Sequence, residues 1–317
     1  MRVVALEEHV TFPALAKTID PAAIAARGHY KGRKVAPGKV SPIELLAEVG
    51  EKRFKSMDDA GISFTVLSNS GAGPDLVPGP DGVTLAQKVN DALADVVVKN
   101  SKRFAAFAAL PMASADACAA ELKRAVKDLK MVGAMVHGTT EGRFLDHPSY
   151  DALLSAAVEL DVPIYIHPNV PSLDIQKAYY SGLPDGADRV VGTAGWGWHS
   201  EVAIHILRMV FAGTFDKHPK LKMIIGHMGE MLPVMLARLD DVGAKPSPIR
   251  SGSPPAASSP SRRSSQRFRP SASTASCSRS TIRSRATRRA RSSSAKSRSR
   301  RPTWRSSATA TPTRCSS

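Results

Sequence analysis

The chain has 317 residues and a formal net charge of +16, a value typical of proteins that bind nucleic acid. This charge is unevenly distributed, because residues 244–317 hold 18 of the 44 Lys and Arg residues and no Asp or Glu. Residues 1–243 therefore carry 26 basic and 28 acidic residues, a net of −2, so we predict a near-neutral globular body without a nucleic-acid partner.

The same composition argues against membrane insertion and secretion. No run approaches the roughly 18 apolar residues that a membrane-spanning helix needs, and the residues after Arg2 predict a strand rather than a signal peptide. Of three cysteines only Cys118 lies in the body, which suits a reducing compartment. We therefore expect a cytoplasmic protein with no membrane partner.

Apolar runs alternate with helical patterns along the body. We predict six strands, at 3–9, 63–68, 104–110, 132–137, 163–167 and 221–227. We predict helices at 42–50 after Ser41, 52–60, 85–100, 115–129 after Ser114, 150–160 and 200–214, and a long polar loop with one short helix before residue 41. Nearly continuous apolar strands separated by helices indicate a parallel sheet that is buried on both faces.

Six such units fit either an open doubly wound sheet or most of a (β/α)8 barrel. No Gly-x-Gly-x-x-Gly follows the first strand, which counts against a dinucleotide-binding fold. In a barrel, the carboxyl ends of the strands form the active site. Polar residues gather at the predicted strand ends: Glu7, His9, Asn69, His137, His167 and His227.

Glu7 and His9 lie two residues apart on the first strand, so both side chains face the same side. A carboxylate and an imidazole suit a divalent metal, although the spacing alone also fits an exposed pair. The histidines at later strand ends, His167 and His227, favour the metal interpretation. We expect His137 only to line the barrel mouth. Four further histidines are expected at the surface or on helices: His29, His147, His205 and His218.

Residues 244–317 differ in kind from the body, because the periodicity ends and 23 serines occur among 74 residues. One interpretation is a disordered basic tail. Our preferred hypothesis is a frameshift. If the true frame starts at the third base of each printed codon, the new codon takes its last two bases from the next residue. A following Ser then gives an apolar residue, and a following Thr gives Asp, Asn, His or Tyr. Residues 273–284 then permit Asp-Arg-Ile-Leu-Leu-Ala-Val-Asp-Asp-Pro-Phe, a buried strand followed by acids.

Four segments of the body resemble the metal-dependent decarboxylases of the amidohydrolase superfamily, such as γ-resorcylate, 2,3-dihydroxybenzoate and aminocarboxymuconate semialdehyde decarboxylases. These segments are Ala5–His9, Ile166–Pro168, Thr193–Glu201 and Ile225–Glu230. The resemblance covers residues 1–241 and implies an α/β fold of (β/α)8 TIM-barrel type, often dimeric or tetrameric. We therefore predict a barrel domain over residues 1–243 with strands one to six, and a low-complexity tail over 244–317 in which strands seven and eight are lost.

The resemblance also implies the roles of individual residues. It assigns Glu7, His9 and His167 as ligands of one zinc or manganese ion, and His227 with Glu230 as catalytic residues. Arg238 matches an arginine of the family's active-site region and would contact the carboxylic acid substrate. Independently of the resemblance, Trp196 and Trp198 would either form an aromatic wall against the substrate or serve packing. The remaining ligand of the family, an Asp after strand eight, is missing, because Ser280 and Thr281 occupy its place.

These observations lead to a predicted function and to two alternatives. We expect non-oxidative decarboxylation of a hydroxybenzoate-type acid. A hydrolase of the same superfamily, acting on a lactone or amide, would use a similar site. The third interpretation is an inactive, frame-disrupted product or a basic-tailed binding protein.

Overall fold

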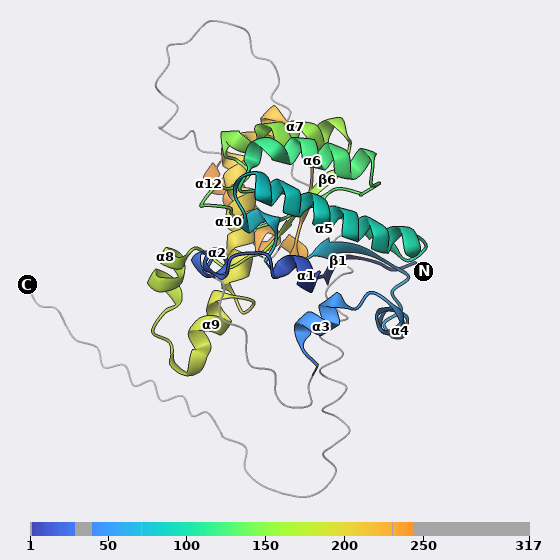
Figure 1. Cartoon of the computed structure of the whole chain (residues 1–317). Helices are drawn as coiled ribbons and strands as arrows, with labels where there is room; N and C mark the ends of the chain where they lie inside the picture. The colour runs from blue at the N-terminus through green and yellow to red at the C-terminus, as the bar shows by residue number, and fades with distance from the viewer. Residues whose placement is uncertain (1, 29–39, 71, 230, 244–317) are drawn as a thin grey trace, which may run out of the picture. The chain divides into compact units, whose positions relative to one another are not determined.

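The computed structural model describes residues 2–28, 40–70, 72–229 and 231–243 (Figure 1). Every strand pair in this part of the chain is parallel, with the order β1-β2-β3 in one sheet and β4-β5-β6-β7 in the other. The strands are β1 (Val4–Val10), β2 (Phe64–Asn69), β3 (Phe104–Ala106), β4 (Ala108–Ala109), β5 (Ala134–His137), β6 (Pro163–His167) and β7 (Lys222–Ile225). This arrangement confirms the predicted parallel α/β fold. β7 is the sixth of the predicted strands, because the third is divided into β3 and β4. The predicted loss of a seventh and an eighth barrel strand concerns residues 244–317, which lie outside the described residues.

The predicted strand 104–110 is divided at Phe107, where the chain changes its hydrogen-bonding neighbour. The amide of Phe107 donates to Leu67 O on β2 at 2.8 Å, whereas the amide of Ala108 donates to Gly133 O next to β5 at 2.8 Å. The side chain of Phe107 packs in a small cluster with Val66, Met135 and Tyr165. One predicted strand therefore bridges the two sheets.

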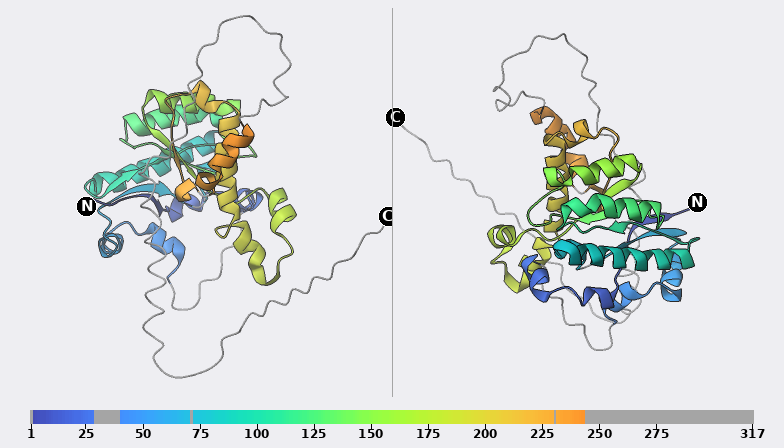
Figure 2. Two further views of the ribbon diagram at one scale, coloured as in Figure 1. Left: turned by 180° about the vertical axis from the view of Figure 1, so that it is seen from behind. Right: turned by 45° about the horizontal axis from the view of Figure 1, so that its top comes forward.

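Helices α5 (Gly79–Lys99), α6 (Ala115–Lys127) and α7 (Asp151–Glu159) lie side by side against the strands (Figures 1 and 2). Their buried sides form the main apolar core together with strand residues such as Leu67 and Ile164. The other helices are α1 (Pro13–Ala16), α2 (Pro21–Ala26), α3 (Pro42–Ala47), α4 (Glu51–Asp59), α8 (Leu173–Ile175), α9 (Ala187–Gly192), α10 (Gly197–Phe211), α11 (Thr214–Lys217) and α12 (Leu232–Gly243). Within the described ranges, no helix combines the length and apolarity needed to cross a membrane.

Several element boundaries differ from the prediction for local reasons. The polar stretch before residue 41 contains α1 and α2, each of which begins at a proline with a pre-set φ. Ser41 caps α3 in a capping box with Glu44, as expected of a Ser before a helix. Ser114 precedes α6 but makes no capping bond, because its hydroxyl donates to Gly79 O at 3.3 Å.

A buried amide connects α5 to β4 and α6. The side chain of Asn90 donates to Ala109 O at 2.9 Å and to Glu121 Oε1 at 2.6 Å, and it accepts from Ala109 N at 2.8 Å. β4 is only two residues long, so these bonds replace ladder hydrogen bonds that a longer strand would supply. Asn90 is therefore required for the position of the short strand.

We expect Asn90→Leu to lower the free energy of unfolding by about 3 kcal/mol, because it leaves two backbone groups of Ala109 buried without partners. Urea denaturation measures this change. The matched control is Asp95→Asn, an exposed position on the same helix, which should stay within about 0.5 kcal/mol of the unmodified protein. Equal stability of Asn90→Leu and the control would contradict this role.

Two histidines expected at the surface or on helices, His205 and His218, are buried. His218 lies beside Asp151, with Nε2 at 2.8 Å from Oδ1. His205 on α10 is 1% exposed, and its Nε2 accepts the amide of Leu145 at 2.9 Å. Burial lowers the pKa of His205 to about 4, more than the nearby Asp146 raises it. The helical pattern of the sequence did not show that the His205 side chain is buried, because a histidine can lie on either face of a helix.

The native state therefore favours the neutral ring of His205, while the unfolded chain binds a proton near pH 6.5. This contribution to stability is complete above pH 6.5 and is lost as the pH falls toward 4. His205→Gln keeps an acceptor without a charge, so its stability relative to the unmodified protein should rise by up to about 3 kcal/mol between pH 7 and pH 4. His147→Gln, at a solvent-accessible turn, serves as the control in urea titrations. A constant difference across this range would contradict the prediction.

Candidate metal centre

Three of the predicted ligands meet at the carboxyl ends of the strands. Glu7 and His9 come from β1 and His167 ends β6, and one donor atom from each lies within 4.8 Å of the other two. A β-bulge between Ala5 and Glu8 shifts the register of β1 against β2, and such bulges re-aim side chains. Among the described residues, these three side chains are the one group of His, Cys, Asp or Glu that could hold a metal ion.

The carboxylate of Glu7 is the centre of this group. Its Oε1 lies 3.3 Å from His167 Nε2 and 2.7 Å from His227 Nε2, and its Oε2 accepts the hydroxyl of Tyr165. Burial raises the pKa of Glu7, but hydrogen bonds from His167 and His227 outweigh it, so the pKa lies well below its usual range. Glu7 is therefore a carboxylate, as metal binding requires.

His9 is oriented by a hydroxyl on the neighbouring strand. Its Nδ1 lies 2.8 Å from Ser68 Oγ, and its Nε2 lies 3.1 Å from His167 Nε2. Burial, the larger cause, and the neighbouring His167 together lower the pKa of His9 to about 3. A neutral ring oriented through its second nitrogen is typical of a metal-ligating histidine. The donor set of one carboxylate and two imidazoles suits a divalent ion such as zinc.

His227 follows β7 at the start of a 3-10 turn (His227–Gly229). Its backbone has φ +49°, in the left-handed region that non-glycine residues seldom adopt, and its amide lies 3.4 Å from Glu7 Oε2. At the preceding Gly226, an added Cβ would lie 2.7 Å from Ile166 O, so only glycine allows this approach to β6. The sequence Gly226-His227 therefore brings the imidazole against Glu7.

Two other predicted site residues, Trp196 and Arg238, are exposed. Trp196 precedes α10 and is 44% exposed. Arg238 lies exposed on α12, and no hydrogen bond or ion pair among the described residues involves it. Glu230 lies outside the described residues.

Three neighbours of the group, Tyr165, Ser68 and His199, were not assigned a role from the sequence, and a fourth, His137, was expected only to line the barrel mouth. Tyr165 is buried and bonds to Glu7, and Ser68 bonds to His9. The ring of His199 lies 5.3 Å from that of His227 between centroids, and His137 lies 5.0 Å from His167. Burial lowers the pKa of His137 well below its usual value, and His167 and His9 add to this effect. Tyr165 could have been found, because it is two residues before His167 on the same face of a strand.

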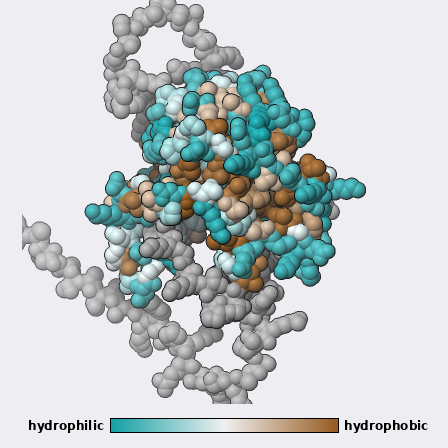
Figure 3. All heavy atoms as spheres, viewed as in Figure 1, coloured by the Kyte–Doolittle hydropathy of each residue, from teal (hydrophilic) through white to brown (hydrophobic). Residues whose placement is uncertain are grey.

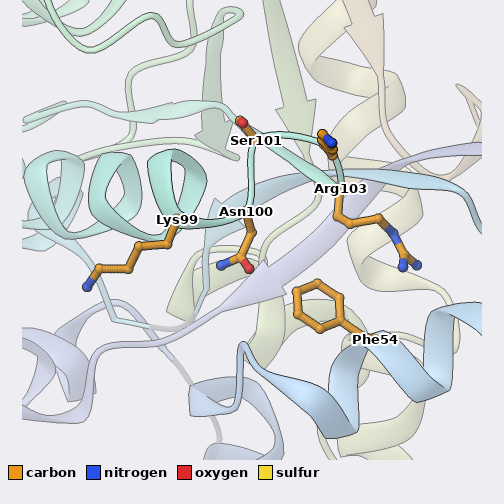
Figure 4. A pocket seen from close by; sticks show the side chains of 6 residues that line it. Phe54, Lys99, Asn100, Ser101 and Arg103 are labelled. Atoms are coloured by element: carbon orange, nitrogen blue, oxygen red, sulfur yellow. The ribbon is translucent and has the colours of Figure 1, made fainter.

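A surface cavity of about 490 Å³ lies away from this centre, before the amino end of β3 (Figure 4). The guanidinium of Arg103 lies 5.3 Å from the centre of the Phe54 ring and pairs with Asp58 at 2.7 Å. In parallel α/β barrels this end usually serves stability rather than chemistry. The cavity is lined by Phe54, Lys99, Asn100, Ser101, Lys102 and Arg103.

Comparison with known proteins places this geometry in a family. The sequence model of the Amidohydrolase family matches residues 35–276. The chain is 36% identical over 245 residues to decarboxylase orsB of Emericella nidulans, covering 77% of this chain and 70% of the relative. It is also 36% identical over 244 residues to γ-resorcylate decarboxylase of a Rhizobium species, covering 75% and 69%. The chain belongs to the amidohydrolase family.

A solved structure supports the same conclusion. It is the 5-carboxyvanillate decarboxylase of Novosphingobium aromaticivorans in complex with manganese and 4-hydroxy-3-methoxy-5-nitrobenzoic acid, with a TM-score of 0.65 and 29% identity over 77% of this chain and 70% of that chain. These amidohydrolase relatives are named decarboxylases, which confirms the resemblance and favours it over the hydrolase alternative. The family match ends at residue 276, beyond the predicted domain boundary at residue 243. That boundary remains a prediction.

We expect Tyr165→Phe to weaken Mn²⁺ or Zn²⁺ binding roughly 10–100-fold, because the carboxylate of Glu7 loses the hydroxyl that orients it. Isothermal titration calorimetry on the metal-free protein measures the affinity. Tyr179→Phe, at a side chain that is 75% exposed, is the matched control and should bind as the unmodified protein does. Unchanged affinity in Tyr165→Phe would show that Glu7 is held by its other contacts.

Proposed function

We propose that the protein is a metal-dependent decarboxylase of a hydroxybenzoate-type acid. The observation that carries this proposal is the donor group of Glu7, His9 and His167 at the strand ends, with His227 in contact with Glu7. The names of its amidohydrolase relatives supply the reaction class. The aromatic acids named for the γ-resorcylate and 5-carboxyvanillate enzymes supply the substrate class.

In this proposal Glu7, His9 and His167 hold one divalent ion, manganese or zinc. Bound there, the ion would supply the positive charge that attracts the carboxylate and adjacent hydroxyl of the substrate. The carboxylate of Glu7 contacts both His167 and His227, so it can orient the catalytic imidazole of His227 relative to the ion. Tyr165 and Ser68 fix the carboxylate of Glu7 and the ring of His9.

The reaction needs one proton, which replaces the carboxylate on the ring carbon as carbon dioxide leaves. We assign the delivery of this proton to His227, with Glu230 as the proposed assisting residue. A histidine suits this task because its proton exchanges readily near neutral pH. Trp196 and Arg238 remain the proposed substrate contacts, and an aromatic wall at Trp196 would exclude water from the substrate.

We further propose a cytoplasmic homo-oligomer. Apolar side chains are exposed on α3 and on the helices that follow β6, and Figure 3 shows apolar surface between hydrophilic regions on one face. Exposed apolar surface of this kind is typical of protein interfaces. Examples with more than half of their surface exposed are Ile43, Leu45, Phe211, Val234 and Val242.

We expect the full-length protein with added Mn²⁺ or Zn²⁺ to release carbon dioxide from 2,6-dihydroxybenzoate or related hydroxybenzoates. His227→Asn should lower kcat roughly 10²–10⁴-fold, because it removes the proposed proton donor while leaving the donor group in place. Coupled measurement of carbon dioxide and product tests both statements. His147→Asn, outside the centre, is the control.

Release of acid from a lactone panel, without carbon dioxide from any hydroxybenzoate, would instead support the hydrolase alternative. A folded protein that turns over neither substrate class with either metal would support the inactive, frame-disrupted product. Resequencing the gene across codons 238–317 then decides whether the frame is the cause.

A further inference from the structure

The three donors of this group leave positions around a divalent ion open. Glu7, His9 and His167 supply three donors, whereas zinc in proteins usually takes four ligands. Residues 242–317 contain no Asp or Glu, so that part of the sequence offers no further carboxylate. A further protein donor among the described residues would come from a side chain next to the group, beside a position that stays open for water or substrate.

His137 occupies the position next to this group. It ends β5 and pairs in register with His167 on β6, so both side chains point to the same side of the sheet. Its ring centroid lies 5.0 Å from that of His167 and 6.4 Å from that of His9. Imidazoles that share one ion at about 2.1 Å per nitrogen have centres roughly 4.5–6.5 Å apart, so these spacings are compatible with a shared ion.

The nitrogen of His137 is also uncommitted. Its Nε2 is buried from solvent and makes no hydrogen bond, which is uncommon for a buried polar atom. By contrast, His227 directs its Nε2 at Glu7 Oε1, 2.7 Å away. The Nε2 of His137 would therefore gain a partner by binding an ion, whereas the Nε2 of His227 already contacts Glu7.

We propose that His137 is a fourth protein ligand of the metal centre, so that the ion is held by three imidazoles and one carboxylate. This inference rests on the proposed metal site at Glu7, His9 and His167. The Nε2 of His137 lies outside the set of donor atoms within 4.8 Å of one another, so binding draws its ring inward by a side-chain rotation. The ion thereby satisfies a nitrogen that otherwise lacks a partner.

The additional imidazole has a consequence for metal choice. Imidazole ligands suit zinc and copper, whereas manganese favours carboxylate, carbonyl and water ligands. A site with three imidazoles therefore shifts selectivity toward zinc relative to a site with two. Removing His137 should lower zinc affinity more than manganese affinity.

The test uses the full-length, metal-free protein and three variants: His137→Gln, His137→Asn and the control His147→Gln. Calorimetric titration with Zn²⁺ and with Mn²⁺ gives the ratio of the two affinities. We expect both His137 variants to lose at least about tenfold in zinc affinity and a smaller factor in manganese affinity, while the control is unchanged. Electron paramagnetic resonance of the Cu²⁺-loaded protein should show three coupled nitrogens, and two in a folded His137 variant.

Two results separate the possible failures. Equal zinc affinity in the unmodified protein and both His137 variants, combined with loss of binding in His167→Gln, would overturn the role of His137 alone. Unchanged zinc binding in His167→Gln would overturn the proposed metal site itself. Circular dichroism on every variant verifies that affinities are compared between folded proteins.

Discussion

The carboxylate of Glu7 is the interaction on which the centre depends. It is buried in the first strand and contacts groups from β6 and from the turn after β7, which are 158 and 220 residues away in sequence. A buried charge is unfavourable unless it is fully hydrogen-bonded, and Tyr165, His167 and His227 provide this compensation. The first strand, which belongs to the β1-β2-β3 sheet, thereby contacts β6 and the turn after β7 of the other sheet.

Much of this arrangement follows from local sequence signals. Continuous apolar runs located the strands, and the polar residues that end them located Glu7, His9 and His167, because parallel strands bring their carboxyl ends to one edge. The division of 104–110 at Phe107 was not predictable, because an apolar run does not record which neighbour each residue bonds. The short helices α8 and α9 were also missed, since segments of this length carry too little periodicity.

The partners of the site residues were the least predictable feature. Ser68 and Tyr165 lie on buried strands where a hydroxyl looks like an exception in an apolar pattern. Their roles depend on the register between strands. The hydrophobic pattern shows which face of a strand is buried, but not which residues of neighbouring strands lie side by side. His137 illustrates the same limit, because its closeness to His167 comes from the pairing of β5 with β6. The carboxylate and imidazole residues could be found from sequence, whereas the groups that orient them needed the fold.

The backbone of His227 carries a consequence for selection. A non-glycine residue in the left-handed region is strained by roughly 1–3 kcal/mol, and glycine at this position would remove that strain. Glycine would also remove the imidazole that contacts Glu7 and leave that carboxylate without one of its compensating partners, a loss at least as large as the strain. Engineering a more heat-resistant form of this protein should keep position 227 fixed, because the strained backbone and the contact with Glu7 come from the same residue.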